Sequence, residues 1–175
     1  MFAYDFRENR IPLESESESN YWRDVGTIDS YWEANMDLKG VYPTFNLYNR
    51  QWPIRTASDL APPAKFVQGP TGGMGEAINS LISEGCIISG GLVKDCVIGR
   101  NIFVGNDAEV IDSILMDNVV VGDGVKISKA VIDKNVRIGP GLEIGFDLEK
   151  DRKKYFVTDS GIIVIEKGTK LPKSF

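Results

Sequence analysis

The sequence predicts a mainly β protein whose centre is a left-handed parallel β-helix built from hexapeptide repeats. Apolar residues recur every six positions between about 86 and 145, and Gly often follows them. A period of six fits neither an α-helix nor an alternating strand, but it is typical of a solenoid whose short strands each point one apolar residue inward. Composition then divides the chain into a small α/β region (1–39), a linker (40–77) and the β-helix with a C-terminal strand extension (78–175).

Two apolar sets define the repeat. The first, interrupted by single-residue slips, comprises Ile98, Val104, Val110, Met116, Val121, Ile127, Ile132, Ile138 and Ile144. The second follows four places later, at Ile102, Ala108, Ile114, Val125, Val136 and Leu142. We expect roughly three turns of solenoid, wound with the left hand that hexapeptide repeats adopt against the usual right-handed rule. Six residues are expected to be buried: Ile98, Val104, Val110, Ile127, Ile138 and Ile144.

Glycines that follow the first apolar set are expected at the corners of the solenoid. They are Gly99, Gly105, Gly122, Gly139 and Gly145. Tight corners need positive backbone dihedral angles, which Gly adopts without steric cost.

Residues 1–39 mix aromatic segments with one predicted helix. The segments "MFAYDF" and "YWRDVG" are strand-like, and the acidic run "ESESES" between them is expected to be a solvated loop. Thr27 is placed to act as an N-cap, with Asp29 in the first turn where the helix dipole favours negative charge. Four residues then follow three-and-four spacing: Ile28, Tyr31, Trp32 and Asn35. Residues 28–38 are therefore predicted to form a helix whose aromatic face must be covered.

Residues 40–77 have the composition of an ordered connector. Prolines break any long helix or central strand there, at Pro43, Pro53, Pro62, Pro63 and Pro70. The Gly-rich run "GPTGGMG" could suggest a phosphate cradle. It lacks the Lys-Ser/Thr ending of a P-loop and the strand and helix of a dinucleotide-binding turn, so a ligand loop is the less favoured reading.

Composition excludes several classes of function. The chain has no His, which excludes Ser-His and Cys-His catalysis and removes a common zinc ligand. Cys86 and Cys96 have no further cysteine partners and are expected to be small apolar residues in a reducing cytosol. A net charge of -5 argues against nucleic acid as a partner. No stretch approaches the ~20 apolar residues needed to cross a bilayer. We therefore expect a cytoplasmic protein with no nucleic-acid or membrane partner.

The order of five segments closely resembles bacterial ADP-glucose pyrophosphorylase, also called glucose-1-phosphate adenylyltransferase. The segments are "YWRDVGTIDSYWEANMDL", "LYNRQWPIRT", "PPAKFV", the hexapeptides with "AVIDKNVRIG", and "SGIIVIEKG". The resemblance covers nearly the whole chain, yet in that family these segments form only the C-terminal part of a chain more than twice as long. Residues 1–39 would then be the remnant of a nucleotidyltransferase domain. The family's "GGxGTRL"-type ATP loop has no counterpart here, because "GPTGGMG" follows the signature and contains neither Arg nor Lys.

The resemblance implies that Trp22, Arg23 and Asp24 lie beside the glucose-1-phosphate pocket of the complete enzyme. Trp22 would lie against the sugar, because an indole offers an apolar face to a sugar ring. Asp24 would position the substrate or its Mg²⁺, for which a carboxylate is a hard oxygen ligand. Structural alternatives are that Trp22 packs under the helix and that Asp24 pairs with Arg23 or caps a turn. For this chain alone, we expect no cofactor and no catalytic residue.

Resemblance to plant and cyanobacterial members also implies an allosteric site at Lys134, in "IDKNVRIG", and Lys167, in "SGIIVIEKG". The corresponding lysines bind a phosphorylated activator, and an ammonium group is a suitable point charge for phosphate. Glu166 departs from the apolar residue that those relatives carry. The alternative is that both lysines are exposed at solenoid corners without a ligand.

Two functions remain open on this basis. In the first, the chain is the C-terminal part of an enzyme that converts ATP and glucose-1-phosphate into ADP-glucose and pyrophosphate for glycogen biosynthesis. It would supply oligomerisation, allosteric regulation and one wall of the sugar-phosphate pocket. In the second, it is a free-standing, non-catalytic regulatory or assembly subunit. In either case we expect the chain alone to be inactive.

The expected partners are a second copy of the chain and a phosphorylated metabolite. Family members are homotetramers in which the β-helix contributes contacts. We therefore expect a dimer or tetramer formed through solenoid faces or through the aromatic segment around Trp22 and Trp32.

Overall fold

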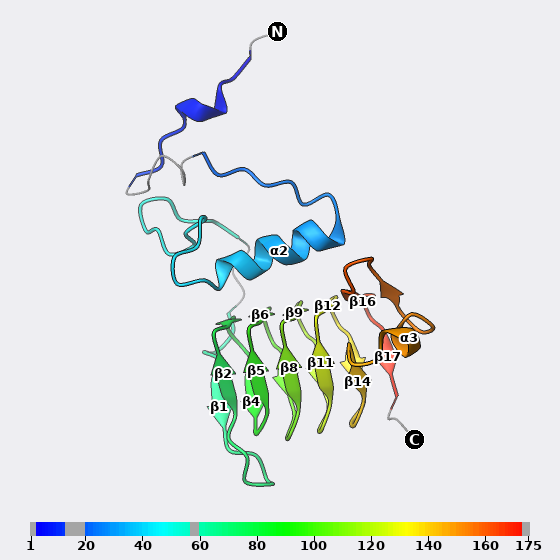
Figure 1. Ribbon diagram of the computed structural model, residues 1–175. Helices are drawn as coiled ribbons and strands as arrows, with labels where there is room; N and C mark the ends of the chain where they lie inside the picture. Colours follow the sequence, from blue (N-terminus) through cyan, green and yellow to red (C-terminus); the bar gives the residue numbers. More distant parts are fainter. Residues whose placement is uncertain (1–2, 13–19, 57–59, 173–175) are drawn as a thin grey trace.

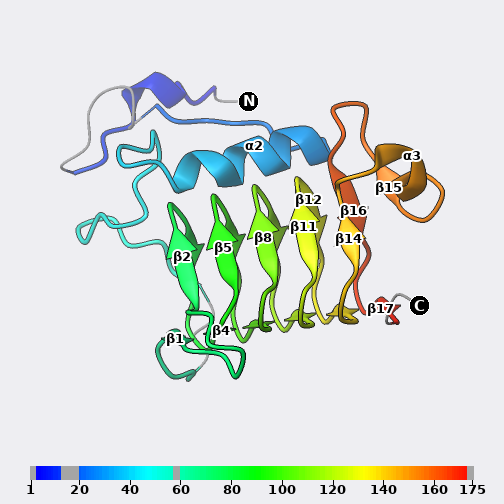
Figure 2. The same cartoon turned by 60° about the horizontal axis from the view of Figure 1, so that its bottom comes forward.

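The computed structural model describes residues 3–12, 20–56 and 60–172. A β-helix runs from Lys65 to Leu171, and one long helix lies along one of its three faces (Figure 1). The N-terminal residues lie on the side of the helix away from the sheets, and the segment that follows the helix lies beside its C-terminal end (Figure 2).

Each turn of the β-helix contributes one strand to each of three sheets. The first sheet contains β1 (Lys65–Val67), β4 (Ile87–Ser89), β7 (Phe103–Val104), β10 (Val120–Val121), β13 (Arg137–Ile138) and β17 (Lys170–Leu171). The second contains β2 (Glu76–Ile78), β5 (Leu92–Lys94), β8 (Glu109–Ile111), β11 (Lys126–Ser128) and β14 (Glu143–Ile144). The third contains β3 (Leu81–Ile82), β6 (Val97–Ile98), β9 (Ile114–Leu115), β12 (Ala130–Ile132), β16 (Ile163–Ile165) and the antiparallel β15 (Phe156–Val157).

The solenoid is longer than the roughly three turns expected from its repeat. Strands β1 to β12 complete four circuits, and helix α3 (Leu148–Asp151) interrupts a fifth between β14 and β16. Strand β1 and the first two residues of β2 lie within the segment 40–77 that composition assigned to a linker. Pro70 and the Gly-rich run occupy the loop between these two strands, so they do not prevent pairing.

The winding is left-handed, as the hexapeptide pattern predicts. In Figure 2 the strands of the second sheet run upward on the near side while the chain advances from left to right. Residues 17 apart stack on successive turns, as Asn118 and Asn135 do, whereas three full hexapeptides would need ~18 residues. Each such turn therefore drops one residue, which explains the single-residue slips in the sequence.

The interior confirms the predicted core. All six residues expected to be buried are at most 2% exposed. Cys86 and Cys96 are free and buried in the same cluster. Burial raises the pKa of Cys96 to about 12, so this thiol serves as an apolar filler and not as a reactive thiolate.

The expected role of the corner glycines was wrong for four of the five. Of these five, only Gly145 has a positive φ. Seven left-handed positions of the solenoid are held by Asp or Asn, whose short side chains hydrogen-bond locally and tolerate this region. They are Asn79, Asp95, Asn101, Asp107, Asp112, Asn118 and Asn135. Gly105 is needed for a different reason, because a Cβ there would lie 2.9 Å from the Asp123 backbone nitrogen on the next turn.

The N-terminal region contains the predicted helix but none of the expected strands among its described residues. Helix α2 (Ile28–Leu38) starts at the N-cap Thr27, which forms a capping box with Ser30. Before it, the described residues form only the short 3-10 helix η1 (Phe6–Glu8). The described N-terminal residues pair with no edge of the three sheets, and an isolated strand-like segment is not stable without such a partner. The run "ESESES" lies outside the described residues.

Gly105→Ala is expected to lower the free energy of unfolding by about 1–3 kcal/mol, because its methyl group would push neighbouring turns apart. The matched control is Gly124→Asn. Gly124 has a φ of +65° and open space around its Cα, which Asn tolerates. Urea denaturation of both variants gives the comparison, and equal stability of the two would contradict the close-approach explanation.

Candidate functional site

Helix α2 lies across the strands on the outer face of the third sheet (Figure 2). Outward-facing residues of the solenoid form an apolar row there: Val97, Ile114, Met116, Val131 and Ile162. The helix contributes Ile28, Tyr31, Trp32 and Met36 to the same cluster. Strands are spaced ~4.8 Å apart and an α-helix rises ~5.4 Å per turn, so each turn of α2 meets about one strand. The aromatic face that we expected to need a cover, and that we offered as an association surface around Trp32, is therefore covered by the solenoid of the same chain.

Polar contacts fix the C-terminal half of α2 to one corner of the solenoid. Lys39 Nζ lies 3.0 Å from Asp95 Oδ1, and the Trp32 indole N–H donates to the Asp112 carbonyl at 3.2 Å. Hydrogen bonds from Asn79 and Lys39 lower the pKa of the Asp95 carboxyl. Burial raises the pKa of Asp112 on the next turn. The helix is thus held by an ion pair and an indole hydrogen bond as well as by apolar packing.

A second set of contacts, which we call the clasp, holds the N-terminal end of α2. Asp29 accepts hydrogen bonds from the hydroxyl groups of Thr158, at 3.2 Å, and Ser160. Lys129 Nζ donates to the Ser160 carbonyl at 2.5 Å. The clasp therefore joins α2 to the turn between β15 and β16, which lies beside this end of the helix (Figure 2).

Arg23 ties the segment before α2 to the helix itself. Its guanidinium pairs with Glu33, at 3.1 Å, and with Asp37. Both acids lie on α2, away from the sheet cluster, so the pairing requires the helix to be formed. Of the adjacent residues Arg23 and Asp24, it is therefore Arg23 that binds the helix.

Trp22 and Asp24 lie at the surface. Trp22 is 74% exposed and does not pack under the helix. Asp24 Oδ1 accepts a hydrogen bond from the Gly26 backbone N–H at 3.0 Å, so the alternative in which Asp24 caps a turn describes the structure. Within the described ranges, no group of three or more His, Cys, Asp or Glu side chains is placed to hold a metal ion.

Lys134 and Lys167 are brought together at one corner of the solenoid, which we call the lysine corner. Strands β12 and β16 pair with Ile132 opposite Ile165, so the two lysines occupy equivalent positions on adjacent turns. The Gly168 N–H donates to the Lys134 carbonyl at 2.9 Å. Both lysines are exposed.

A groove of about 410 Å³ runs between the first turn of α2 and the third sheet. Its lining residues are Val25, Gly26, Thr27, Ile28, Tyr31, Met116, Val131, Asp133 and Val164. Burial and the nearby charge of Asp133 raise the pKa of Tyr31. We call Trp22, Arg23 and Asp24 the Trp-Arg-Asp motif. Because Asp133 precedes Lys134, the groove leads from the lysine corner to the residues that follow this motif.

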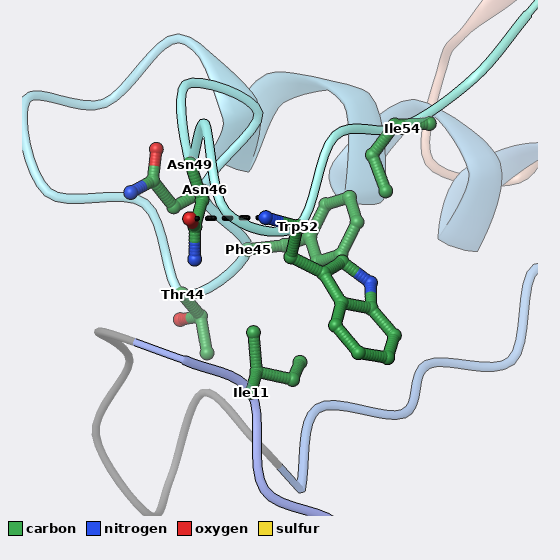
Figure 3. A pocket seen from close by; sticks show the side chains of 7 residues that line it. All are labelled: Ile11, Thr44, Phe45, Asn46, Asn49, Trp52 and Ile54. Carbon is green, nitrogen blue, oxygen red and sulfur yellow. Dashed lines mark hydrogen bonds between the residues drawn. The ribbon is translucent and has the colours of Figure 1, made fainter.

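The segment "LYNRQWPIRT" packs against the N-terminal residues around a small cavity (Figure 3). Asn49, which is buried, donates to the Pro12 carbonyl at 2.8 Å and accepts from the backbone N–H of Gln51 and Trp52. The cavity measures about 10 Å³, which is room for at most one water. It is therefore a packing feature and not a substrate site.

Sequence reasoning missed the clasp and the corner residues. Asp29 was recognised only as a first-turn acid, and nothing local in "VTDSGI" marks Thr158 and Ser160 as its partners. The corner asparagines carried a signal that was available, because Asn101, Asn118 and Asn135 recur at a spacing of one turn.

In the part of the chain that the structure describes, no helix is long and apolar enough to span a membrane.

Comparison with known proteins gives one family and a consistent set of relatives. The family described as GlmU-like, C-terminal hexapeptide matches residues 62–165. A glucose-1-phosphate adenylyltransferase of Anaeromyxobacter dehalogenans is 56% identical over 98% of this chain and 42% of its own length. Enzymes of the same name from Thermus thermophilus and Deinococcus radiodurans are 51% and 47% identical, over 96% and 95% of this chain. The chain thus spans about two-fifths of the curated relatives that it matches.

Trp32→Ser is expected to undock α2, because it removes both an aromatic contact with the sheet and the bond to Asp112. The loss should lower the free energy of opening the helix by about 2 kcal/mol. Hydrogen exchange of residues 28–38 measures it directly. The matched control is Trp22→Ser, at an exposed indole, which should leave exchange unchanged; equal effects of the two variants would refute this docking geometry.

Proposed function

The chain belongs to the family described as GlmU-like, C-terminal hexapeptide, and we propose that it is the C-terminal part of a glucose-1-phosphate adenylyltransferase. The proposal rests on 47–56% identity, over at least 95% of this chain, to enzymes of that name. Such an enzyme joins ATP and glucose-1-phosphate into ADP-glucose and pyrophosphate. The alternative of a free-standing subunit is not favoured, because these relatives carry the same segments within a longer enzyme.

In the complete enzyme, Trp22 and Asp24 would form one wall of the sugar-phosphate pocket. The exposed indole of Trp22 is available to the apolar face of a sugar ring. Asp24 uses one carboxylate oxygen to cap its turn, which leaves the other for the substrate or for Mg²⁺. One or two carboxylates together with substrate phosphates are a common Mg²⁺ ligand set. The ion would neutralise phosphate charge, while Arg23 holds this wall against α2.

The lysine corner would bind the phosphate of a metabolite effector. Two ammonium groups on adjacent turns, with strands ~4.8 Å apart, can share one phosphate group. Among the described residues, neither ammonium group forms an ion pair. A cytoplasmic location goes with this proposal, since both cysteines are free, as in reducing compartments.

Self-association would use the open N-terminal end of the solenoid. Phe66 and Ala77 are exposed there, although their strand register aligns them with the buried Ile88 and Val93 of the next turn. The opposite end is covered by the α3 region, where Tyr155 packs against the core. A second copy meeting the open end would cover this apolar surface and the unpaired strand edges.

The enzymatic proposal is tested by replacing the equivalent part of the Anaeromyxobacter dehalogenans relative with this chain. The chimera should form ADP-glucose from ATP, glucose-1-phosphate and Mg²⁺, whereas the chain alone should not. Asp24→Asn in the chimera should lower kcat/KM by about 10- to 100-fold, because substrate is then misplaced. Glu109→Gln, on the outer face of β8, should leave it unchanged. An active isolated chain, or a folded but inactive chimera, would overturn the proposal.

Sedimentation at micromolar concentration tests self-association. We expect a dimer or tetramer, which Ala77→Lys should weaken by placing a charge at the open end, while Glu109→Lys on a side face should have no effect. Trp32 is not a suitable probe of self-association, because it packs against the third sheet of its own chain. A sharp 19.4 kDa monomer that persists on concentration would rule the association out.

A further inference from the structure

We propose that the clasp couples the lysine corner to the Trp-Arg-Asp motif, so that an anion bound by Lys134 and Lys167 docks helix α2 more firmly. This inference rests on the effector role proposed above and adds the route by which the effector acts. It is carried by contacts between Asp29 and a turn 129 to 131 residues away in the sequence.

The clasp and the lysine corner lie at opposite ends of the same pair of strands, β12 and β16. At one end, Lys129 Nζ donates to the Ser160 carbonyl, and the Ile163 N–H donates to the Lys129 carbonyl at 3.1 Å. At the other end, the two lysines of the corner face solvent. Three paired residues separate the ends, a span of ~10 Å. A change in the pairing of β16 with β12 at one end should therefore alter their pairing at the other end.

The turn between β15 and β16 is firm enough to transmit such a change. Thr158 N–H donates to the Ile162 carbonyl at 3.0 Å, and Gly161 N–H donates to the Thr158 carbonyl at 3.0 Å. The Ile162 N–H also donates to the Thr158 hydroxyl at 3.1 Å. The same hydroxyl donates to Asp29. A displacement of β16 should therefore move Thr158 and Ser160, the partners of Asp29, together with the turn.

Helix α2 is the element with two states. It has eleven residues, none of them fully buried, and a helix of this length is marginal in water without packing. Undocking therefore also melts the helix. Arg23 pairs with Glu33 and Asp37 only while the helix exists, so the position of the motif depends on docking.

The direction of the effect follows from charge. Lys134 and Lys167 lie at equivalent positions two residues beyond the ends of the paired strands β12 and β16, where like charges on adjacent turns are destabilising. A bound phosphate group removes this repulsion, so β16 should pair more firmly with β12 and hold Ser160 and Thr158 against Asp29. Asp133, beside Lys134, lines the groove toward Tyr31, and Lys134 also interacts with the charge of Asp117 on the preceding turn.

The test titrates the chain with inorganic pyrophosphate while hydrogen exchange of residues 28–38 is followed. In the wild type, saturation should slow exchange of α2 at least threefold, and Lys134→Ala should abolish both binding and this response. Asp29→Ala, which removes the acceptor of both clasp hydrogen bonds, should still bind but lose the response, and its affinity should fall by the same factor, because coupling between sites is reciprocal. Asp107→Asn, at a distant corner that tolerates Asn, should behave as the wild type.

Two outcomes separate the clasp from the effector proposal. Equal affinity and equal protection of α2 in the wild type and Asp29→Ala would overturn the clasp while leaving the effector site intact. No pyrophosphate binding by the wild type would overturn the lysine corner as an anion site, and this inference with it, while the enzymatic role is judged by the chimera. Ser160→Ala, which removes one hydroxyl of the clasp, gives the same readout if Asp29→Ala does not fold.

Discussion

The close stacking of successive turns is the constraint on which the rest of this structure depends. Neighbouring strands must approach to ~4.8 Å, so the backbone at Gly105 and Gly99 leaves no room for a side chain beneath the next turn. The same stacking brings equivalent positions into straight rows. Inward rows form the apolar core, and outward rows decide what each face of the solenoid presents.

One outward row makes the solenoid a platform for helix α2. Apolar residues on the third sheet match the spacing of the helix turns, and the helix is fastened at both ends, by Lys39 to Asp95 and by Asp29 to the clasp. A helix this short depends on such packing. The segment that carries the Trp-Arg-Asp motif is thereby held through Arg23, although it makes no strand of its own.

Another outward row brings Lys134 and Lys167 together and gives the proposed regulatory site its geometry. The same two strands connect this corner to the clasp. Proposed substrate and effector residues, separated in the sequence by more than a hundred positions, are thus joined by one strand pair and one helix. That arrangement makes the C-terminal part of such an enzyme more than a passive spacer.

The sequence by itself determined the solenoid, its buried residues and the bounds of helix 28–38, because six-residue periodicity and helix capping are properties of neighbouring residues. The tertiary structure decided what covers the aromatic face of that helix, because the apolar row that packs against it forms only when the turns of the solenoid stack. It also decided that Asp29 bonds to Ser160 and that Arg23 pairs with acids of α2. Asp and Asn, and not Gly99 or Gly105, adopt the left-handed conformation at solenoid corners. These outcomes depend on which residues stack on successive turns, and that depends on the length of every turn between them. A local sequence pattern does not show the combined length of several turns.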